Sequence, residues 1–398
     1  MLTSIYTARI LGKVGFGELG IIRSSVLMFG SLAGFGIGLA ATKYIAEFRT
    51  IDKLKTGRII GVLNATSTTL GLSASVLCFF MSDFLSIAMF SSSDFSVMIK
   101  YASPLLFLGS YSSYQIGVIS GFEKFKALSL IMLVDSALLL LFIGLGTYYY
   151  GVSGALIGTV ISSILGVFVK GFYLVKIYGI HEISITHKSY KSEIFNLMKF
   201  VLPTIFFGVA LQPFEWFSRV LLSRQNHGTA ELGIFLVAFT WSQLVMFLPL
   251  QLTGSLGAIL PNLLANGDVK QVKRAIKKSF ILIFIFSILT ALVLFAISNF
   301  ILRSYGSDFA NGKISLYVMI ATYSVAAITV LFRSILIILN KPWIQFIHTI
   351  ILGFLLVAGT YFFIRNGSLG LSQAYFVSHS IFTVIQFITV FTMLRKMQ

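Results

Sequence analysis

Long apolar segments follow one another along almost the whole chain, and they constrain its fold more than any other feature. A helix needs about 20 apolar residues to cross the hydrocarbon core of a bilayer, and most of these segments reach that length. Of the 398 residues, 57% are hydrophobic and only 11% are charged. Soluble domains carry about 25% charged residues, so a soluble core could not absorb this sequence. We therefore predict an all-α integral membrane protein.

The apolar segments predict about twelve transmembrane helices. The first is incomplete, because only residues 1–8 precede Arg9 and so short a segment cannot span a bilayer. The sequence thus indicates that helix 1 is truncated at its N-terminus. The other spans are predicted at residues 19–42, 59–81, 97–120, 128–150, 154–178, 194–222, 232–256, 279–302, 314–339, 343–364 and 370–394.

The positive charges follow the predicted topology. A net charge of +17 could indicate nucleic-acid binding, but most Lys and Arg residues fall in alternate loops, among them 43–58, 170–199 and 270–278. The positive-inside rule places those loops and both termini in the cytoplasm, and no nucleic-acid partner is expected. Cys78 is the single cysteine, which excludes a disulfide framework and a multi-cysteine metal site. No metal or cofactor is expected.

Short motifs recur at a nearly constant separation, which indicates an internal repeat. Glu18-Leu19-Gly20 returns as Glu231-Leu232-Gly233, and three further matches follow in the same order. These matches are Asp52 with Asp268, Lys124 with Lys341, and Gly151 with Gly367. We predict a six-helix lobe at residues 1–180, a cytoplasmic linker at 181–193 and a second six-helix lobe at 194–398. Parallel repeats of this kind occur in transporters, with the substrate path between the halves.

A few charged residues lie inside the predicted spans, where a central charge costs about 2.5–3.5 kcal/mol on insertion scales. Arg23, Arg219 and Arg333 favour an anionic substrate, because guanidinium binds phosphate in a bidentate manner. Glu215 precedes Arg219 by one helical turn and is expected to pair with it. Asp135 and Arg333 lie deepest and could pair with each other. The sequence has no phosphate-binding loop, so ATP is not expected to drive transport directly. Asp135 and Glu215 are therefore candidates for coupling transport to protons or sodium.

Three segments carry a resemblance to a known family. "ARILGKVGFGELG" at 8–20, "GLAATKYIAE" at 38–47 and "GTAELGIF" at 228–235 resemble the polysaccharide flippases of bacterial O-antigen and related surface glycans. These belong to the superfamily of multidrug, oligosaccharidyl-lipid and polysaccharide exporters. The resemblance implies that the chain moves an undecaprenyl-pyrophosphate-linked oligosaccharide across the bacterial inner membrane by alternating access. It implies membrane lipids, a glycan polymerase and glycosyltransferases as partners.

The resemblance also bears on the site. Arg9 stands in an "AR-x-x-G" motif that is similar to one closing the first helix of the related lipid II flippase, where an arginine serves the cavity. Arg23, Arg219 and Arg333 join it on depth alone as candidates for the pyrophosphate. Arg23 would be tolerated because its helix lines the mouth of a wet cavity. The sequence departs from the family at the start of helix 1 and at Ser218, where an acidic residue is expected.

Two other functions remain open on the sequence. A multidrug or cation antiporter of the same superfamily would favour an acidic cavity, whereas arginine dominates the charged residues inside the spans. A membrane glycan polymerase or glycosyltransferase would carry a long outer loop with catalytic residues. The longest predicted outer loop, residues 82–96, is short and has no cluster of His, Asp and Glu. We therefore favour a transporter over an enzyme.

Overall fold

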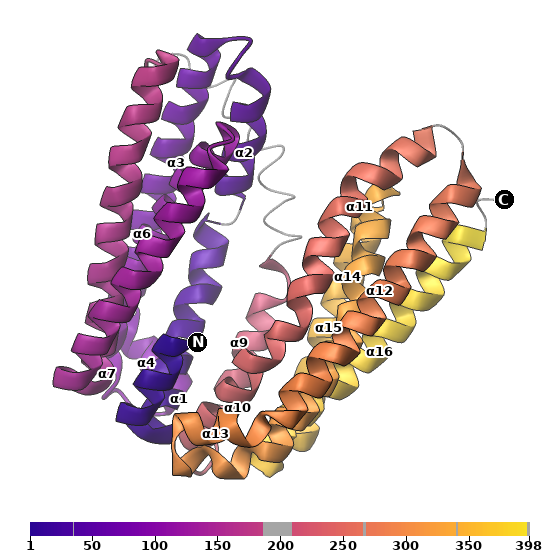
Figure 1. Ribbon diagram of the computed structural model, residues 1–398. Helices are drawn as coiled ribbons and strands as arrows, with labels where there is room; N and C mark the ends of the chain where they lie inside the picture. Colours follow the sequence, from indigo (N-terminus) through magenta and orange to yellow (C-terminus); the bar gives the residue numbers. More distant parts are fainter. Residues whose placement is uncertain (35, 186–208, 266–267, 340, 396–398) are drawn as a thin grey trace. The chain divides into compact units, whose positions relative to one another are not determined.

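The computed structural model describes residues 1–34, 36–185, 209–265, 268–339 and 341–395. This described part is helical, without a strand, as the sequence predicts (Figure 1). It divides into two compact units. Unit 1 comprises Met1–Leu11 and Glu18–Trp216, and unit 2 comprises Gly12–Gly17 and Phe217–Gln398. The predicted boundaries at residues 180 and 194 stay a prediction.

Unit 1 is a helical bundle with a core formed between α2, α3, α6 and α7. Tyr114 and Val118 of α6 are buried there against Ile45 of α2, Ile60 of α3 and Ile177 of α7. Gly12 adopts φ 65° and ψ −177°, which divides α1 into two helical pieces. The helices of this unit are α1 (Leu2–Gly34), α2 (Ile37–Phe48), α3 (Lys53–Phe80), α4 (Ser82–Phe90), α5 (Ser96–Ala102), α6 (Pro104–Gly121) and α7 (Phe125–His181). Residues Gly12–Gly17 of α1 belong to unit 2.

Unit 2 is a second helical bundle, with a core of its own. Leu331 and Ile335 of α14 are buried against Leu256 of α11, Ile283 of α12 and Val390 of α16. Its elements are α9 (Gln212–Ser223), α10 (Gly228–Ser242), η1 (Gln243–Met246), α11 (Phe247–Ala265), α12 (Val269–Ala296), α13 (Ser298–Tyr305), η2 (Ser307–Gly312), α14 (Lys313–Ile338), α15 (Pro342–Phe363), η3 (Ile364–Asn366) and α16 (Gly367–Arg395). The first residues of α9, up to Trp216, belong to unit 1.

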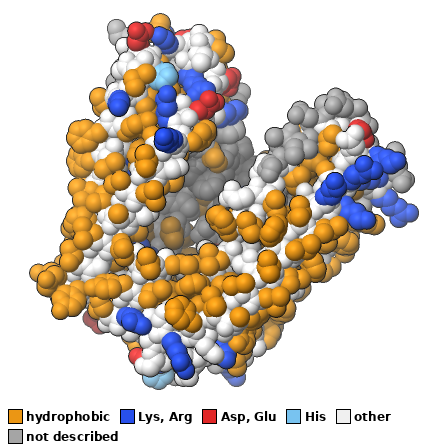
Figure 2. Space-filling view, in the orientation of Figure 1, with side chains coloured by type: hydrophobic (Ala, Val, Ile, Leu, Met, Phe, Trp, Pro, Cys, Tyr) orange, Lys and Arg blue, Asp and Glu red, His pale blue; other side chains and the backbone are white. Residues whose placement is uncertain are grey.

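Six helical segments of the described chain are long and apolar enough to cross a membrane. Two of them, Phe125–His181 with 57 residues and Pro342–Arg395 with 54, are helical hairpins and provide two spans each. The other four are Lys53–Phe80, Gly228–Gly254, Lys270–Ala296 and Ser307–Ile338. Figure 2 shows that the visible surface of each unit is mainly hydrophobic, as lipid contact requires. These segments confirm the predicted spans in their regions.

The remaining spans differ from the prediction. The span at 19–42 is broken near Gly36, which adopts a left-handed φ of 54° ahead of α2. The span at 97–120 is divided at Ser103, between α5 and α6. The span at 279–302 begins earlier, because the lysines assigned to the preceding loop lie within α12; their long stems allow the charged ends to leave the apolar region. Most of the span at 194–222 lies outside the described residues.

The internal repeat is visible in the backbone of the two units. Asp52 accepts a hydrogen bond from the Lys55 N–H at 2.8 Å and caps α3, while Asp268 accepts from the Gln271 N–H at 2.9 Å and caps α12. Both capped helices contain 28 residues. The hairpin glycines share one conformation: Gly151 has φ 57° and ψ −134°, and Gly367 has φ 62° and ψ −133°. Residues that carry a side chain rarely adopt this φ, so both turns require glycine.

The repeated Glu-Leu-Gly motif has a structural role in unit 2. The Glu231 carboxylate accepts a hydrogen bond from the Ser368 N–H at 2.7 Å and so holds the beginning of α16. Gly233 packs directly against the Lys13 carbonyl, where a Cβ atom would collide with the backbone. The motif therefore fastens α10 to its neighbours, and its presence does not by itself mark a binding site.

Candidate functional site

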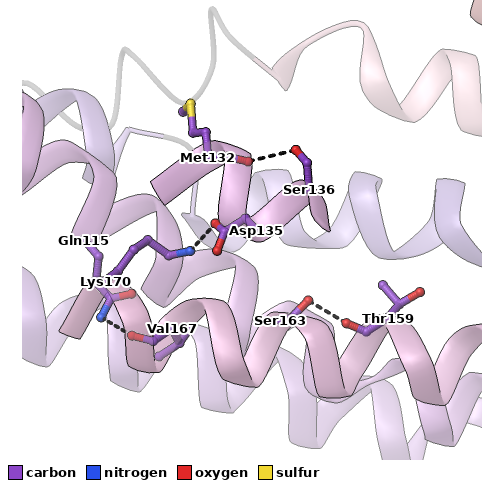
Figure 3. Close-up of polar contacts among 8 residues, drawn as sticks. All are labelled: Gln115, Met132, Asp135, Ser136, Thr159, Ser163, Val167 and Lys170. Atoms are coloured by element: carbon purple, nitrogen blue, oxygen red, sulfur yellow. Dashed lines mark hydrogen bonds and ion pairs between the residues drawn. The ribbon is translucent and has the colours of Figure 1, made fainter. Parts of the chain in front are cut away.

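An ion pair inside unit 1 is the clearest candidate for a functional site in the described chain. The Lys170 ammonium lies 2.5 Å from Oδ2 of Asp135, and the two residues come from opposite arms of the α7 hairpin (Figure 3). The side chain of Lys170 is only 3% exposed, and that of Asp135 is 31% exposed. Asp135 lies ten residues into α7, about 15 Å from the helix end at 1.5 Å per residue. The pair therefore sits at membrane depth, where charged residues usually serve a function.

A polar cavity of about 260 Å³ opens beside this pair. The two charged residues line it together with serine hydroxyls from three helical segments. These serines are Ser112 of α6, Ser136 of the α7 arm before Gly151 (the first arm) and Ser162 of the arm after it (the second arm). Oδ1 of Asp135 is buried and has no hydrogen-bond partner among the described residues. An unpaired carboxylate oxygen in a serine-lined cavity is a suitable ligand for a proton or a small hard cation.

Gly166 makes the close approach of the two charges possible. It lies on the second arm, and a Cβ atom there would stand 2.6 Å from Oδ1 of Asp135 and 3.1 Å from Nζ of Lys170. Real Cβ atoms do not approach so closely, so any side chain would push the carboxylate away from the arm. The small residue is thus part of the site.

Gln115 of α6 fixes the arm that carries Lys170. Its side-chain amide donates a hydrogen bond to the Val167 carbonyl at 3.0 Å (Figure 3). This hydrogen bond links two helices in an apolar environment. It holds them together because neither group has water as an alternative partner. The position of the ammonium is therefore set by packing and by this bond.

The sequence identifies Asp135 and offers Arg333 as a residue that could pair with it. Lys170 is grouped by the sequence pattern with the basic residues that flank the loop after α7. The structure instead buries Lys170 within the second arm, opposite Asp135. Lys170 lies about as far before the end of α7 as Asp135 lies after its beginning. This match was a signal in the sequence that could have identified the pair.

The predicted arginines have different surroundings. Arg9 and Arg23 lie on α1 in unit 1, the first exposed and the second half-buried. Arg219 of α9 is buried in unit 2, with its guanidinium carbon 4.7 Å from the centroid of the Phe239 ring. Arg333 of α14 is exposed. Within the described chain, neither Arg23 nor Arg333 forms an ion pair.

The other predicted acid, Glu215, lies in the first turn of α9 and is half-buried. It belongs to unit 1, whereas Arg219, one helical turn later, belongs to unit 2. The predicted pairing of these two residues stays a prediction, as does the role of Glu215 in ion coupling.

Comparison with known families gives one match. A family model described as "Polysaccharide biosynthesis protein" matches residues 1–266, which is more than half of the chain. No curated protein matches the chain significantly.

Solved structures share the fold over the full length. An inward-facing multidrug resistance MATE family transporter of the MOP superfamily is similar with a TM-score of 0.87 and 13% identity, over 100% of this chain and 94% of that chain. Its outward-facing conformation gives a TM-score of 0.72 at 13% identity, over 100% and 91%. A MOP superfamily transporter from Pyrococcus furiosus, described as having a binding pocket of reverse polarity, gives 0.72 at 12% identity, over 100% and 91%. The chain thus has the fold of MOP superfamily transporters.

Proposed function

Because the chain belongs to the polysaccharide biosynthesis protein family, we propose that it is a flippase that moves a lipid-linked oligosaccharide across the bacterial inner membrane. The substrate is a repeat unit of a surface polysaccharide, carried on undecaprenyl pyrophosphate. The observation that carries the proposal is the family match combined with a transporter fold over the whole chain. The two units would open alternately to the two sides of the membrane, with both termini in the cytoplasm. A glycan polymerase and glycosyltransferases would act on the same glycan.

The pyrophosphate is proposed to bind arginine side chains. Arg23 and Arg333 support this role because each carries its charge without a carboxylate partner among the described residues. Arg9 and Arg219 complete the proposed set. Arginine suits the task because its planar guanidinium holds two phosphate oxygens at once and stays charged at any physiological pH.

Ion coupling is proposed to occur at Asp135. A proton or a sodium ion that reaches Oδ1 would compete with the Lys170 ammonium for the carboxylate. Release of the ammonium would change how the two arms of α7 hold together, and a ligand that favours one arrangement shifts the population toward it. Glu215 is the second proposed coupling residue.

A multidrug or cation antiporter is the alternative, supported by the fold of the multidrug resistance transporter described above. The two functions predict different substrates for the same protein. An organic cation would be repelled by unpaired arginines and attracted by an exposed acid, whereas a pyrophosphate would show the reverse preference.

A reconstitution experiment tests the flippase. Vesicles containing the protein and a fluorescent undecaprenyl-pyrophosphate disaccharide are treated with a membrane-impermeant quencher, and the quenched fraction is followed over time. We expect faster exchange of the probe than in protein-free vesicles and no uptake of ethidium. Exchange at the protein-free rate, together with gradient-driven ethidium transport, would favour the antiporter.

Arginine variants test the binding role. Arg23→Ala and Arg333→Ala should leave the amount of inserted protein unchanged and stop probe exchange, and the matching lysine variants should be intermediate because they keep charge but lose the bidentate geometry. For Arg219, the double change Glu215→Gln with Arg219→Gln separates a structural pair from a binding residue. Normal exchange in all the alanine variants would exclude pyrophosphate recognition by these residues.

A further inference from the structure

A groove in unit 2 combines an apolar interior with a basic end. Helix α14 packs against both α12 and α16, so it forms the floor and the other two form the walls. The groove has a volume of about 480 Å³, which lies in the range of about 300–1,000 Å³ that is usual for ligand sites. Its interior is lined by aromatic rings, among them Phe280, Phe332 and Phe387.

The aromatic lining is continuous along the groove. The ring of Phe332 lies 6.0 Å from that of Phe387, which in turn lies 5.8 Å from that of Phe391. Phe387 and Phe391 remain 50% and 57% exposed. Such a surface accepts a flexible hydrocarbon chain along its length, since burial of apolar area needs no particular direction.

Three cations stand together at one end of the groove. Lys273 and Lys277 lie one helical turn apart near the beginning of α12, and Arg395 is the last residue of α16. No Asp or Glu is among the described residues that line the groove. Figure 2 shows Lys and Arg side chains gathered at this end of unit 2, beyond its hydrophobic surface. The described lining therefore offers these cations no acidic partner, which leaves them available to an anion.

We propose that this groove binds an anionic phospholipid of the membrane. The acyl chain lies between α12 and α16 on the floor of α14, and the phosphate is held by Lys273, Lys277 and Arg395. Basic residues at a membrane surface attract anionic headgroups, and here they stand at one end of an apolar groove of suitable volume. The site is separate from the Asp135 pair and does not depend on the proposed transport activity.

The experiment measures binding of dioleoyl phosphatidylglycerol to the purified full-length protein by native mass spectrometry, with dioleoyl phosphatidylcholine as the neutral lipid. We expect saturable binding of phosphatidylglycerol and weaker binding of phosphatidylcholine. The double change Lys273→Gln with Lys277→Gln should weaken phosphatidylglycerol binding about tenfold or more.

The matched control is Lys270→Gln with Lys278→Gln, which removes the same charge from the same helix at positions that do not line the groove. It should bind phosphatidylglycerol like the unaltered protein. Equal loss in both double variants, or equal binding of the two lipids, would overturn the proposal. Binding of undecaprenyl phosphate without binding of phosphatidylglycerol would also overturn it, because the groove would then serve the substrate carrier.

Discussion

The hairpin α7 of unit 1 and the hairpin α15–α16 of unit 2 share their turn but differ inside the membrane. Counted from Gly151 and Gly367, the positions of Asp135, Gly166 and Lys170 correspond to Ile351, Phe382 and Gln386. Gln386 is fully buried, and its amide donates to Oε1 of Gln345 at 2.8 Å. At the position of Lys170, unit 2 thus has a glutamine in a neutral hydrogen bond, and its partner Gln345 does not correspond to Asp135.

The difference shows how a duplicated fold can acquire one charged site. The repeated capping and turn residues, such as Asp52 and Asp268, preserve the helices in both units. At the three compared positions, the two hairpins differ in charge and in side-chain bulk. In unit 2 the position of Gly166 is taken by Phe382, a bulky side chain that is buried. Asp135 thus provides a carboxylate inside the unit 1 hairpin, whereas the corresponding position of the unit 2 hairpin is the apolar Ile351.

The largest effect is expected from breaking the unit 1 pair. Lys170→Met should lower the free energy of unfolding by about 3 kcal/mol, because it leaves a partly buried carboxylate without its partner. Gln386→Met is the matched change in unit 2 and should cost only about 1–2 kcal/mol, since it removes one neutral hydrogen bond. Thermal unfolding of the detergent-solubilised proteins measures both. Equal losses would mean that the ion pair is not special to unit 1.

A smaller effect is expected from closing the space beside the pair. Gly166→Ala should destabilise the protein by about 1–3 kcal/mol, because its Cβ atom would collide with Asp135. Gly179→Ala lies on the same arm with nothing within 4 Å of the added atom, so it should stabilise the helix by about 0.5–1 kcal/mol. The same unfolding assay compares them, and a harmless Gly166→Ala would show that the carboxylate is free to move away.

The caps should respond alike in the two units. Asp52→Ala and Asp268→Ala should each cost about 1 kcal/mol, because each removes the acceptor for an N–H group in the first helical turn. The measurement is again the unfolding midpoint. A loss of stability in only one of the two variants would show that the repeated aspartates do not have the same role.

The smallest effect concerns a surface ion pair that, among the described residues, occurs in unit 1 and has no counterpart in unit 2. Lys53 donates to Glu182 at 2.7 Å, and this bond and the charge of Lys53 lower the pKa of the Glu182 carboxyl. In unit 2 the position of Lys53 is taken by Val269. A lowered folded-state pKa means that the stabilisation is present above the unfolded pKa and is lost as the pH falls through the folded value.

The Lys53–Glu182 pair is tested with Glu182→Gln. The unaltered protein should unfold at a slightly higher temperature than the variant at pH 7, and the difference should shrink as the pH falls through the lowered folded-state pKa of Glu182. Both side chains are largely exposed, so solvent screening keeps the effect small. A difference that persists at low pH would assign the stabilisation to packing instead of charge.

The sequence predicts the helices well where hydropathy alone decides them. Each arm of the two hairpins is a full apolar span, and the glycine repeat marks both turns. Hydropathy cannot predict the break at Gly36, because the residues on either side are equally apolar and only the backbone conformation changes there. It also ends α12 too late and begins it too late, since lysines on a helix end resemble lysines in a loop.

The site is predictable only in part. Asp135 stands out because it is an acid in an apolar run, but Lys170 resembles the many basic residues that follow the positive-inside rule. Its role depends on the facing arm, which a one-dimensional pattern does not show. The space for the Asp135 carboxylate depends on Gly166. The importance of this glycine becomes clear only when the structure places the carboxylate beside it.

The most direct test of coupling at the unit 1 pair is the gradient dependence of transport. The double change Asp135→Asn with Lys170→Gln replaces both charges of the unit 1 pair by neutral amides, so neither charge is left buried without its partner. In vesicles with the fluorescent undecaprenyl-pyrophosphate disaccharide, an imposed proton or sodium gradient should accelerate translocation by the unaltered protein and by Gln386→Met. It should leave the rate of the double variant unchanged. Acceleration of the double variant by the same gradient would contradict ion coupling at Asp135.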